Sequence, residues 1–401
     1  VCCFVYKTPL PTMAQKDYSF KPSTVVNIPF EYQNNLIVVD VTFQGFLNLK
    51  FLFDTGAEHS ILSKKNITDK LGIPYRREFQ LIGSDMSSRI TAYLVTGIHL
   101  QLSNMLLSHR SLLVLEEDHL RLEELTGMRI DGILGADIFK RYVVRINYKK
   151  KVISLSRSEN SKVSDKYIEV PTTIFRSKPY INQKIILRQK DTTRVKLLID
   201  TGSALPLLLH SNTHPDIYVP ENAINGILGV GLGGFVEGFV GRTEKMLLDK
   251  EIVMSGILTN FQDVNSGLDT TFLNSRNGVL GNRILDRFDV IINYPKEKIF
   301  LRPRKKWKKP FEYDKSGLVF IVGGASLNKY IVNRVMPNSP AAIAGLKKGD
   351  VVKSLNFLSA NTRGLSGLNR KLRKKEGKKI RIVVKRGEER LVFLFRLKKL
   401  I

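Results

Sequence analysis

Two aspartates in this chain each begin an Asp-Thr-Gly triplet. Asp54 opens Asp-Thr-Gly-Ala, Asp200 opens Asp-Thr-Gly-Ser, and apolar residues precede both of them. Two carboxylates held about 3 Å apart cannot both ionise, so they share one proton. The charged carboxylate can then take a proton from water while the neutral one polarises a carbonyl group. The pair therefore predicts metal-free hydrolysis of a carbonyl compound.

The residues beside these aspartates suit such a site. Gly56 and Gly202 allow the backbone to turn tightly and to approach the carboxylates closely. We expect Thr55 and Thr201 to form hydrogen bonds across a two-fold axis and so hold the two loops in register. Ser203 can bond the outer oxygen of its aspartate, whereas the alanine at the equivalent position cannot. The apolar residues before each aspartate are expected to bury the loops and lower the local dielectric constant.

Further motifs repeat with the same offset as the aspartates. Residues 131–135 (Asp-Gly-Ile-Leu-Gly) match residues 277–281 (Asn-Gly-Val-Leu-Gly), and residues 146–148 match 292–294 (both Ile-Asn-Tyr). The offsets 200 − 54, 278 − 132 and 293 − 147 all equal 146. Three motifs in one register indicate two copies of one unit. The apolar and polar alternation of residues 35–53 predicts that the copies are mostly β-structure.

With these motifs in place, the chain resembles the aspartic peptidases of the retropepsin and pepsin type over about residues 22–303. The matching segments are 52–57 and 198–203 for the active-site loops, and 132–135 and 278–281 for the strands that cross behind them. The resemblance implies a mainly β, two-lobed, pseudo-symmetric fold with closed barrel-like lobes. It also implies that Asp54 and Asp200 are the catalytic pair of an endopeptidase that acts on polypeptide substrates.

Peptidases of this type close a glycine-rich β-hairpin, the flap, over the substrate. Two segments separated by the same offset of 146 (229 − 83) are candidates, and their glycines suit a mobile hairpin. The candidate flap residues are Gly83, Gly229, Gly231 and Gly233. The alternative is an ordinary surface turn. The second segment also matches a dinucleotide-binding pattern, but the residues after it predict a strand where that site requires a helix.

Other chemistry is not indicated by the sequence. The chain has six histidines, and of these His210 and His214 lie four positions apart. Pro215 follows them and no third ligand is near, so this spacing does not predict a zinc site. The only cysteines are Cys2 and Cys3, so the rest of the chain can hold no disulfide. We expect no metal and no other cofactor.

A different pattern follows the second copy. Residues 339–352 resemble a PDZ domain of the kind attached to bacterial envelope proteases, and the likeness covers about residues 316–401. A PDZ domain adds a peptide C-terminus to a sheet edge and binds its carboxylate with backbone N–H groups. The resemblance implies that the peptide-binding residues include Gly317, Leu318, Val319, Phe320 and Leu368. Because Val319 stands where the family has a glycine, a purely structural module is the alternative.

The sequence thus predicts five regions. They are a signal-peptide remnant and leader (1–20), an N-terminal lobe (21–160), a C-terminal lobe (161–303), an exposed basic linker (304–315) and the PDZ-like domain (316–401). The apolar residues 1–5 and the segment 11–15 resemble the end of a secretory signal peptide. We therefore expect export to the periplasm or cell envelope of a bacterium, with an unstructured N-terminus as the alternative.

The chain is strongly basic, with 64 Lys and Arg against 37 Asp and Glu and a net charge of +27. Such a charge favours anionic partners, including peripheral contact with an anionic membrane. No nucleic-acid motif concentrates it, so we expect polypeptide substrates and protein C-termini as partners, not nucleic acid. Two rival functions stay open: a non-catalytic peptide-binding scaffold of the envelope, and a basic binder of nucleic acid or membrane surfaces.

Overall fold

The computed structural model describes residues 4–5, 25–84, 88–118, 122–157, 162–187, 192–231, 234–263 and 276–401. The chain forms two compact units. The two-lobed unit consists of Val1–Leu120, Ile130–Glu221 and Ile227–Pro310, and the C-terminal unit consists of Arg121–Arg129, Asn222–Gly226 and Phe311–Ile401. The predicted leader, residues 1–20, lies outside the described residues except for the short strand β1 (Phe4–Val5), which pairs with β7.

The first lobe is a sheet closed on itself. Its strands pair in the order β8, β9, β6, β10, β5 and β4, and β4 pairs again with β8. Apolar strand residues fill the interior of the closed sheet, as in β4, where six of the eight residues of Leu-Ile-Val-Val-Asp-Val-Thr-Phe are buried. The elements are β3 (Glu31–Gln33), β4 (Leu36–Phe43), β5 (Leu47–Phe53), β6 (Ile61–Leu62), α1 (Lys65–Lys70), β7 (Arg77–Ile82), β8 (Arg89–Leu102), β9 (Met105–Leu115), β10 (Gly132–Leu134) and α3 (Ala136–Phe139).

The second lobe repeats this arrangement and is also closed. Its strands pair in the order β15, β16, β21, β17, β20 and β19, and β19 pairs again with β15. The mainly β fold with barrel-like lobes predicted from the sequence is therefore confirmed. The elements are β14 (Thr172–Phe175), β15 (Lys178–Ile186), β16 (Thr192–Asp200), β17 (Leu207–His210), β18 (Ile224–Gly231), β19 (Gly234–Leu247), β20 (Val253–Gln262), β21 (Gly278–Gly281) and α4 (Asn282–Leu285).

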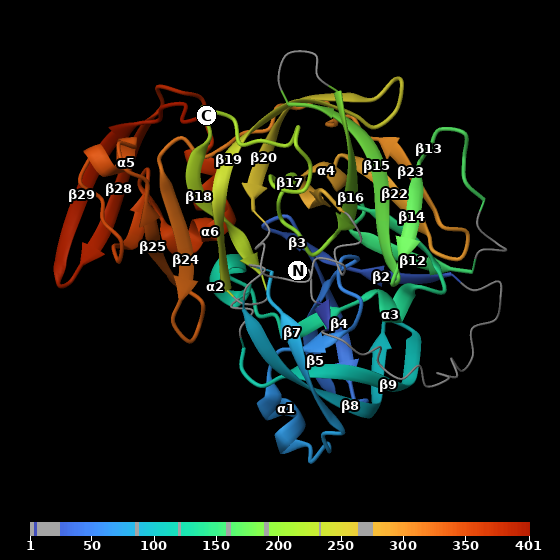
Figure 1. Cartoon of the computed structure of the whole chain (residues 1–401). Coiled ribbons are helices and arrows are strands. Elements are labelled where there is room, and N and C mark those ends of the chain that lie inside the picture. The colour runs from blue at the N-terminus through green and yellow to red at the C-terminus, as the bar shows by residue number, and fades with distance from the viewer. Residues whose placement is uncertain are drawn as a thin grey trace. The chain divides into compact units, whose positions relative to one another are not determined.

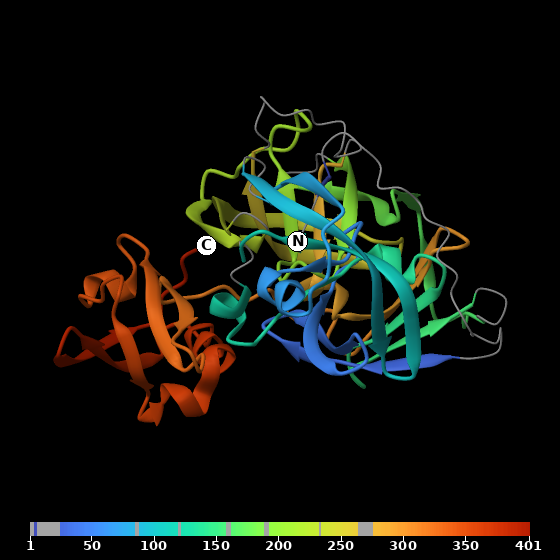
Figure 2. The same cartoon turned by 90° about the horizontal axis from the view of Figure 1, so that it is seen from below.

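A further sheet joins the two lobes. Figures 1 and 2 show the first lobe in blue to teal and most of the second lobe in green to yellow. The joining sheet runs in the order β13 (Ile168–Val170), β23 (Lys298–Pro303), β22 (Phe288–Asn293), β11 (Val143–Asn147), β12 (Val152–Ser156) and β2 (Val26–Pro29). At its centre β11 and β22 are antiparallel, with Val144 opposite Ile292 and Ile146 opposite Val290. Each of these pairs becomes the other under the 146-residue offset, so the pairing lies on the pseudo-two-fold axis.

Glycine is required where the strands cross behind the aspartate loops. A Cβ atom on Gly132 would lie 2.3 Å from the carbonyl oxygen of Ile61, and one on Gly278 would lie 2.0 Å from that of Leu208. No side chain fits at these distances, which explains the glycine that opens each Gly-Ile/Val-Leu-Gly motif. Strand β10 then pairs in parallel with β5, and β21 pairs in parallel with β16.

The basic segment 304–315 is held more firmly than the exposed linker that the sequence predicts. Arg287 donates through Nη1 to the carbonyl oxygen of Trp307 at 3.0 Å. Lys306 Nζ lies 2.7 Å from Asp286 Oδ2. The first part of this segment, up to residue 310, therefore belongs to the two-lobed unit, and the rest belongs to the C-terminal unit.

The C-terminal unit packs a helix and an antiparallel sheet around one core. The sheet runs in the order β24, β25, β26, β28 and β29, with β27 paired to β26. Its elements are β24 (Leu318–Gly323), β25 (Lys329–Val335), α5 (Pro340–Ile343), β26 (Val351–Leu355), β27 (Leu358–Ser359), α6 (Ala360–Leu372), β28 (Lys379–Arg386) and β29 (Glu389–Arg396), together with α2 (Leu122–Thr126). In the part of the chain that the structure describes, no helix is long and apolar enough to cross a bilayer.

The Ser-Pro-Ala-Ala motif and the Gly-Asp that follows it each have a structural role in this unit. The Ser339 side chain caps α5 by accepting a hydrogen bond from the Ala342 N–H, with Pro340 as the first helical residue. Asp350 is buried, accepts from the Lys347 N–H at 2.9 Å and is bonded by both Nε and Nη2 of Arg386. The motif thus fixes the turns that connect β25, α5 and β26.

Candidate active site

Each aspartate lies at the end of a strand of its own lobe, in the interior of the two-lobed unit. Asp54 directly follows β5 and is 0% exposed, and Asp200 ends β16 and is 2% exposed. The Gly56 N–H donates to Asp54 Oδ1 at 2.7 Å, and the Gly202 N–H donates to Asp200 Oδ1 at the same distance. The Ala57 N–H also donates to Asp54 Oδ1, at 3.1 Å. The two loops therefore hold their carboxyl groups in matching orientations.

The two threonines connect the loops, as the sequence predicts. The Thr55 N–H donates to Thr201 Oγ1 at 3.0 Å, and the Thr201 N–H donates to Thr55 Oγ1 at 3.1 Å. Each hydroxyl in turn donates to a carbonyl oxygen of the opposite lobe at 2.7 Å, Thr55 to Ile199 and Thr201 to Phe53. These four bonds are buried, and they fix the separation of the two aspartates.

The glycines of the two loops bring the carboxyl groups together. A Cβ atom on Gly56 would lie 2.7 Å from Asp200 Cγ, and one on Gly202 would lie 2.2 Å from Asp54 Oδ2. Each glycine thus lies against the carboxyl group of the other lobe, where no side chain fits. This places Asp54 and Asp200 face to face on the pseudo-two-fold axis, in the arrangement that the repeat predicts.

The electrostatics of the pair follow from burial and from like charge. Burial, the negative charge of Asp200 and a hydrogen bond with it together raise the pKa of Asp54 to about 7, and burial is the largest of these causes. The bond from the Gly56 N–H acts in the opposite direction and is a smaller effect. The pair therefore retains a proton up to about neutral pH, and Asp54 is the group with the raised pKa.

A network behind the Asp54 loop was not predicted from the sequence. The Asp54 N–H donates to the Leu134 carbonyl oxygen at 3.0 Å. The Ser60 hydroxyl accepts from the Gly135 N–H at 3.0 Å and donates to Asp137 Oδ1 at 2.8 Å. Burial raises the pKa of Asp137 to about 6. The sequence signal for this support is Asp137, a polar residue three positions after the crossing strand.

One difference between the two lobes beside the site concerns Asn282. Asn282 donates to the Thr201 carbonyl oxygen and accepts from the Tyr148 hydroxyl at 2.7 Å. The residue 146 positions earlier is Ala136, which offers no such acceptor. The equivalent tyrosine, Tyr294, is buried, and its hydroxyl has no hydrogen-bond partner among the described residues. The repeat is therefore asymmetric in the layer that supports the catalytic loops.

The flap candidates lie on hairpins in both lobes. Gly83 directly follows β7, and its N–H donates to the Ser88 carbonyl oxygen at 2.8 Å, closing the turn between β7 and β8. Gly229 and Gly231 lie in β18, which pairs with β19, whereas Gly233 lies outside the described residues. Because β19 is a strand, the dinucleotide-binding alternative lacks the helix it needs. That these hairpins act as flaps stays a prediction.

The first hairpin also contacts the second lobe. Gln262 Nε2 donates to the Ser84 carbonyl oxygen at 3.3 Å. Gln262 ends β20 and is 6% exposed, so the bond is shielded from solvent. It provides a direct link between one hairpin turn and the opposite lobe.

The bond that the sequence suggests from Ser203 to Asp200 stays a prediction. The Ser203 Oγ atom accepts a hydrogen bond from the Leu205 N–H at 3.4 Å.

The remaining titratable side chains form no metal site in the described part of the chain. The rings of His99 and His109 lie 5.2 Å apart without a third ligand, and burial lowers the pKa of His210 to about 3. His59 lies near the Asp54 loop, and burial together with the charges of Lys140 and Lys178 lowers its pKa to about 4. His59 and His210 are therefore neutral at neutral pH.

The predicted peptide-binding residues of the PDZ-like domain lie on β24 and α6. Leu318, Phe320 and Leu368 are buried in the core of the C-terminal unit, and Val319 is partly exposed. Gly317 precedes β24 with a φ of +82°, and a Cβ atom there would lie 2.2 Å from the side chain of Ser339. The strand and the helix therefore have the positions that the resemblance implies, while their role in binding stays a prediction.

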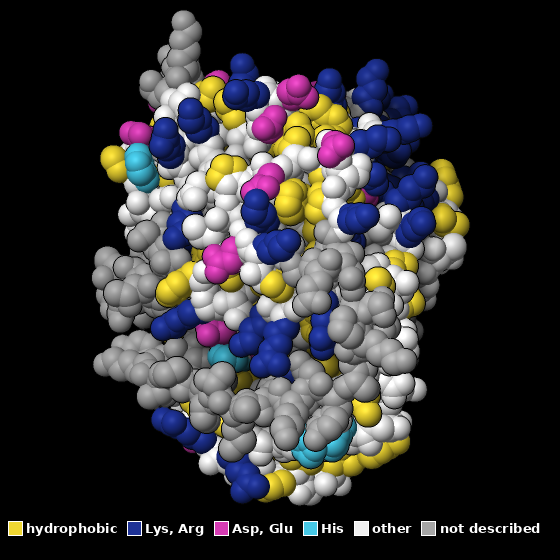
Figure 3. Space-filling view, turned by 90° about the vertical axis from the view of Figure 1, so that its right-hand side faces the viewer, with side chains coloured by type: hydrophobic (Ala, Val, Ile, Leu, Met, Phe, Trp, Pro, Cys, Tyr) yellow, Lys and Arg dark blue, Asp and Glu magenta, His cyan; other side chains and the backbone are white. Residues whose placement is uncertain are grey.

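Basic and acidic side chains are interspersed on one face of the molecule. On the face in Figure 3, Lys and Arg side chains occur over many elements, with acidic side chains between them and one denser basic group at the upper right. Several basic side chains are also neutralised locally, as in the pair of Arg302 with Asp289.

The fold and the paired loops agree with the resemblance to aspartic peptidases that the sequence shows. Comparison with family models agrees, because residues 39–138 match a family described as aspartyl protease and residues 331–386 match a PDZ domain. The chain therefore carries an aspartyl protease domain and a C-terminal PDZ domain. No curated protein matches the chain. The first match lies within the first lobe. The motifs of this lobe recur 146 residues later in the second lobe, which the match does not include.

Proposed function

We propose that this protein is an aspartic endopeptidase that hydrolyses peptide bonds with Asp54 and Asp200. The observation that supports this most strongly is the placement of the two buried carboxyl groups. They come from two different lobes, and each lies against the glycine of the opposite loop. A scaffold without catalytic function would not require this close approach of two acidic groups, because it is unfavourable for stability at neutral pH.

The raised pKa of Asp54 suggests how the two carboxyl groups divide the work. Asp54 keeps its proton, and the ionised Asp200 takes a proton from a water molecule as the water oxygen attacks the scissile carbonyl carbon. The Asp54 proton moves to the carbonyl oxygen, giving a neutral tetrahedral intermediate. Collapse of this intermediate breaks the C–N bond as Asp200 donates its newly acquired proton to the leaving amine. The ionised Asp54 takes a proton from a hydroxyl group of the intermediate, which restores both groups to their starting states. The hydrogen bonds from the Gly56 and Gly202 N–H groups keep both carboxyl groups oriented throughout.

The test is cleavage of a mixed peptide library by the purified chain. We expect the wild-type protein to cleave, Asp54→Asn and Asp200→Asn to be inactive, and a transition-state mimic of aspartic peptidases to inhibit. Chelators should have no effect. Near wild-type cleavage by Asp200→Asn would show that the pair is not the catalytic centre. Binding of peptides without any cleavage would instead favour the alternative of a non-catalytic peptide-binding scaffold.

The PDZ domain is proposed to bind segments of polypeptide substrates or partners, since the family uses its sheet edge for this purpose. Export to the periplasm or cell envelope remains part of the proposal and rests on residues 1–15 alone. N-terminal sequencing of the protein purified from its own cells tests it, because a processed N-terminus near Ala14 or Gln15 is expected. Processing elsewhere, or none, would remove the support for export.

A further inference from the structure

One short helix belongs to the C-terminal unit although its sequence lies within the first lobe. Helix α2 (Leu122–Thr126) and the residues up to Arg129 are part of that unit, whereas the chain before and after them is part of the two-lobed unit. A helix this short is not stable alone in water. Its stability must therefore come from contacts within the C-terminal unit.

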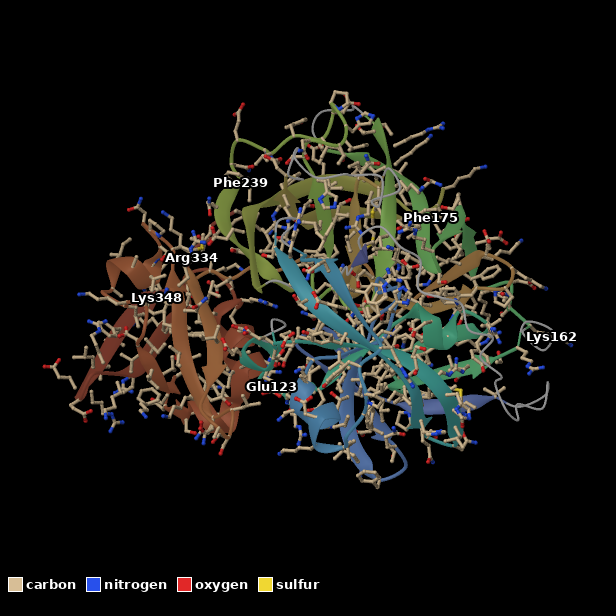
Figure 4. All side chains as sticks on the ribbon, turned by 60° about the horizontal axis from the view of Figure 1, so that its bottom comes forward. Glu123, Lys162, Phe175, Phe239, Arg334 and Lys348 are labelled. Atoms are coloured by element: carbon tan, nitrogen blue, oxygen red, sulfur yellow. The ribbon has the colours of Figure 1, made fainter. Side chains whose placement is uncertain are left out.

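These contacts are with β24 and α6. Helix α2 packs against β24, and Figure 1 shows the teal helix next to this orange strand; Glu123 on α2 is labelled in Figure 4. At Gly127, which follows the helix, a Cβ atom would lie 3.3 Å from Val322 Cγ2 and 4.0 Å from Leu365 Cβ. Val322 belongs to β24 and Leu365 to α6. We use the name PDZ groove for the adjoining parts of β24 and α6 that include Val322 and Leu365, and the backbone at Gly127 lies against both elements.

The local conformation brings the backbone this close. Gly127 has a φ of +65°, and its N–H donates to the Glu123 carbonyl oxygen at 2.8 Å, which ends the helix in the manner typical of glycine. Leu122 and Met128 flank the turn and are 4% and 8% exposed. The segment thus presents a side-chain-free turn to the groove, with buried apolar side chains on both sides of it.

The PDZ groove is the place where a peptide ligand of this domain would bind. Strand β24 is the first strand in the order of its sheet, and a PDZ ligand adds beside such a strand. Donors at the start of β24 are also already used. Asp314 Oδ1 accepts from the Ser316 and Gly317 N–H groups at 2.9 and 2.6 Å, and Ser316 Oγ accepts from the Leu318 N–H at 3.1 Å. Both features reduce access for an external peptide terminus.

We propose that residues 122–130 are an internal ligand of the PDZ groove, and that a polypeptide segment binds there only by displacing them. The chain continues from this segment into β10, whose Leu134 carbonyl oxygen accepts from the Asp54 N–H. A second contact in the C-terminal unit joins Arg334 Nη2 to Asn225 Oδ1 at 3.2 Å, and Asn225 lies in β18, the strand that carries the second flap candidate. Displacement would therefore act along the chain on β10, the strand behind Asp54.

The proposal takes the PDZ role from the proposed function, but it does not depend on catalysis. It can therefore be tested in the full-length Asp200→Asn protein, which leaves peptides intact. The probe is a fluorescent peptide with the sequence of residues 121–130 and an amidated C-terminus, so that no free carboxylate contributes to binding. Apparent affinity for the groove scales with the fraction of molecules in which it is empty.

The perturbing variant is Gly127→Glu, which places a charged side chain against Val322 and Leu365 and should displace the segment. The matched control is Gly72→Glu. Gly72 also follows a short helix with a positive φ, of +62°, but a Cβ atom there has nothing within 4 Å. We expect Gly127→Glu to bind the peptide about 10- to 100-fold more tightly than the parent protein and the control, as for a groove that is at least about 90% occupied.

A second variant tests the contact directly and does not require displacement. A Cβ atom on Gly127 would lie 3.9 Å from Val322 Cβ, which matches the separation in a disulfide. In a background with Cys2 and Cys3 replaced by serine, Gly127→Cys with Val322→Cys should form a disulfide on mild oxidation and should then exclude the peptide. Gly72→Cys with Val322→Cys should form none.

Each outcome decides the proposal. Equal peptide binding by the parent and Gly127→Glu would mean that the groove is empty in solution, and folded Gly127→Glu without binding would mean that the segment is no ligand. Either result overturns the proposal. If Gly127→Glu does not fold, the disulfide decides, since its absence under oxidation would also overturn the proposal. Loss of catalysis in the wild-type protein would bear on the proposed function and not on these measurements.

Discussion

Replacing Asp54 by asparagine is expected to stabilise the protein at neutral pH while it abolishes catalysis. The side chain is fully buried, and its Oδ1 accepts hydrogen bonds from the Gly56 and Ala57 N–H groups. An asparagine oxygen can accept the same two bonds, and its NH₂ group can donate towards Asp200. The variant therefore keeps the geometry of the protonated carboxyl group but can never become charged.

The size of the effect follows from the raised pKa. Asp54 has a pKa of about 7 in the folded protein against an ordinary value of 3.8. A carboxyl group with a raised folded pKa binds its proton more tightly when folded, so its favourable contribution is complete below about pH 4 and is lost as the pH rises to about 7. The difference of about 3 pKa units corresponds to roughly 4 kcal/mol for the coupled pair. Because asparagine cannot ionise, the variant does not lose this free energy as the pH rises.

The assay is thermal unfolding of wild-type and Asp54→Asn protein across about pH 4 to 8. At about 2 °C per kcal/mol for a unit of this size, the melting temperature of the variant should exceed that of the wild type by roughly 8 °C at the upper end and by little at the lower end. Asp165→Asn, the same change at an exposed side chain, should show no such trend. A difference between variant and wild type that is constant with pH would refute the shared-proton reasoning.

Three further predictions concern the support of the site. Thr201→Val removes a hydroxyl with two buried bonds across the lobes, so it should lower stability by about 2–3 kcal/mol in denaturant titrations, whereas Thr201→Ser should largely retain it. Gly202→Ala puts a Cβ atom 2.2 Å from Asp54 Oδ2 and should lower kcat at least about 100-fold in peptide assays; unchanged turnover would contradict the close approach. Ala136→Asn gives the buried Tyr294 hydroxyl an acceptor, as in the other lobe, and should raise stability by about 1 kcal/mol; a loss would mean that the pocket cannot hold the amide.

The two-lobed fold could be predicted because the sequence repeats in one register. Asp54 and Asp200 share their offset with the crossing-strand glycines, so the expected pairing of the loops requires only that both copies fold alike. The bonds between Thr55 and Thr201 follow from the same symmetry. Symmetry also limits the prediction. The two copies carry Asn282 and Ala136 at equivalent positions, but the role of Asn282 in supporting the loop is known only from its hydrogen bonds.

The parts that could not be predicted depend on contacts between residues far apart in sequence. Residues 304–310 are basic and bounded by prolines, which is typical of a linker, but Arg287 binds carbonyl groups of this segment. The place of α2 depends on Gly127 and its contacts with Val322 and Leu365, about 200 positions away. No local pattern in residues 121–129 indicates that their packing partners lie so far along the chain, because a short apolar segment can pack against any apolar surface.

The pairing of β11 with β22 has a consequence for how any activity depends on concentration. In a symmetric dimer such an interface would form between separate chains, and dilution below the dissociation constant would divide the site. Here Val144 and Ile292 belong to one polypeptide, so the two aspartates meet by folding alone. Specific activity should therefore be the same at nanomolar and micromolar protein. Because the halves are also encoded separately, one loop can change without its counterpart, as Ala57 and Ser203 already show.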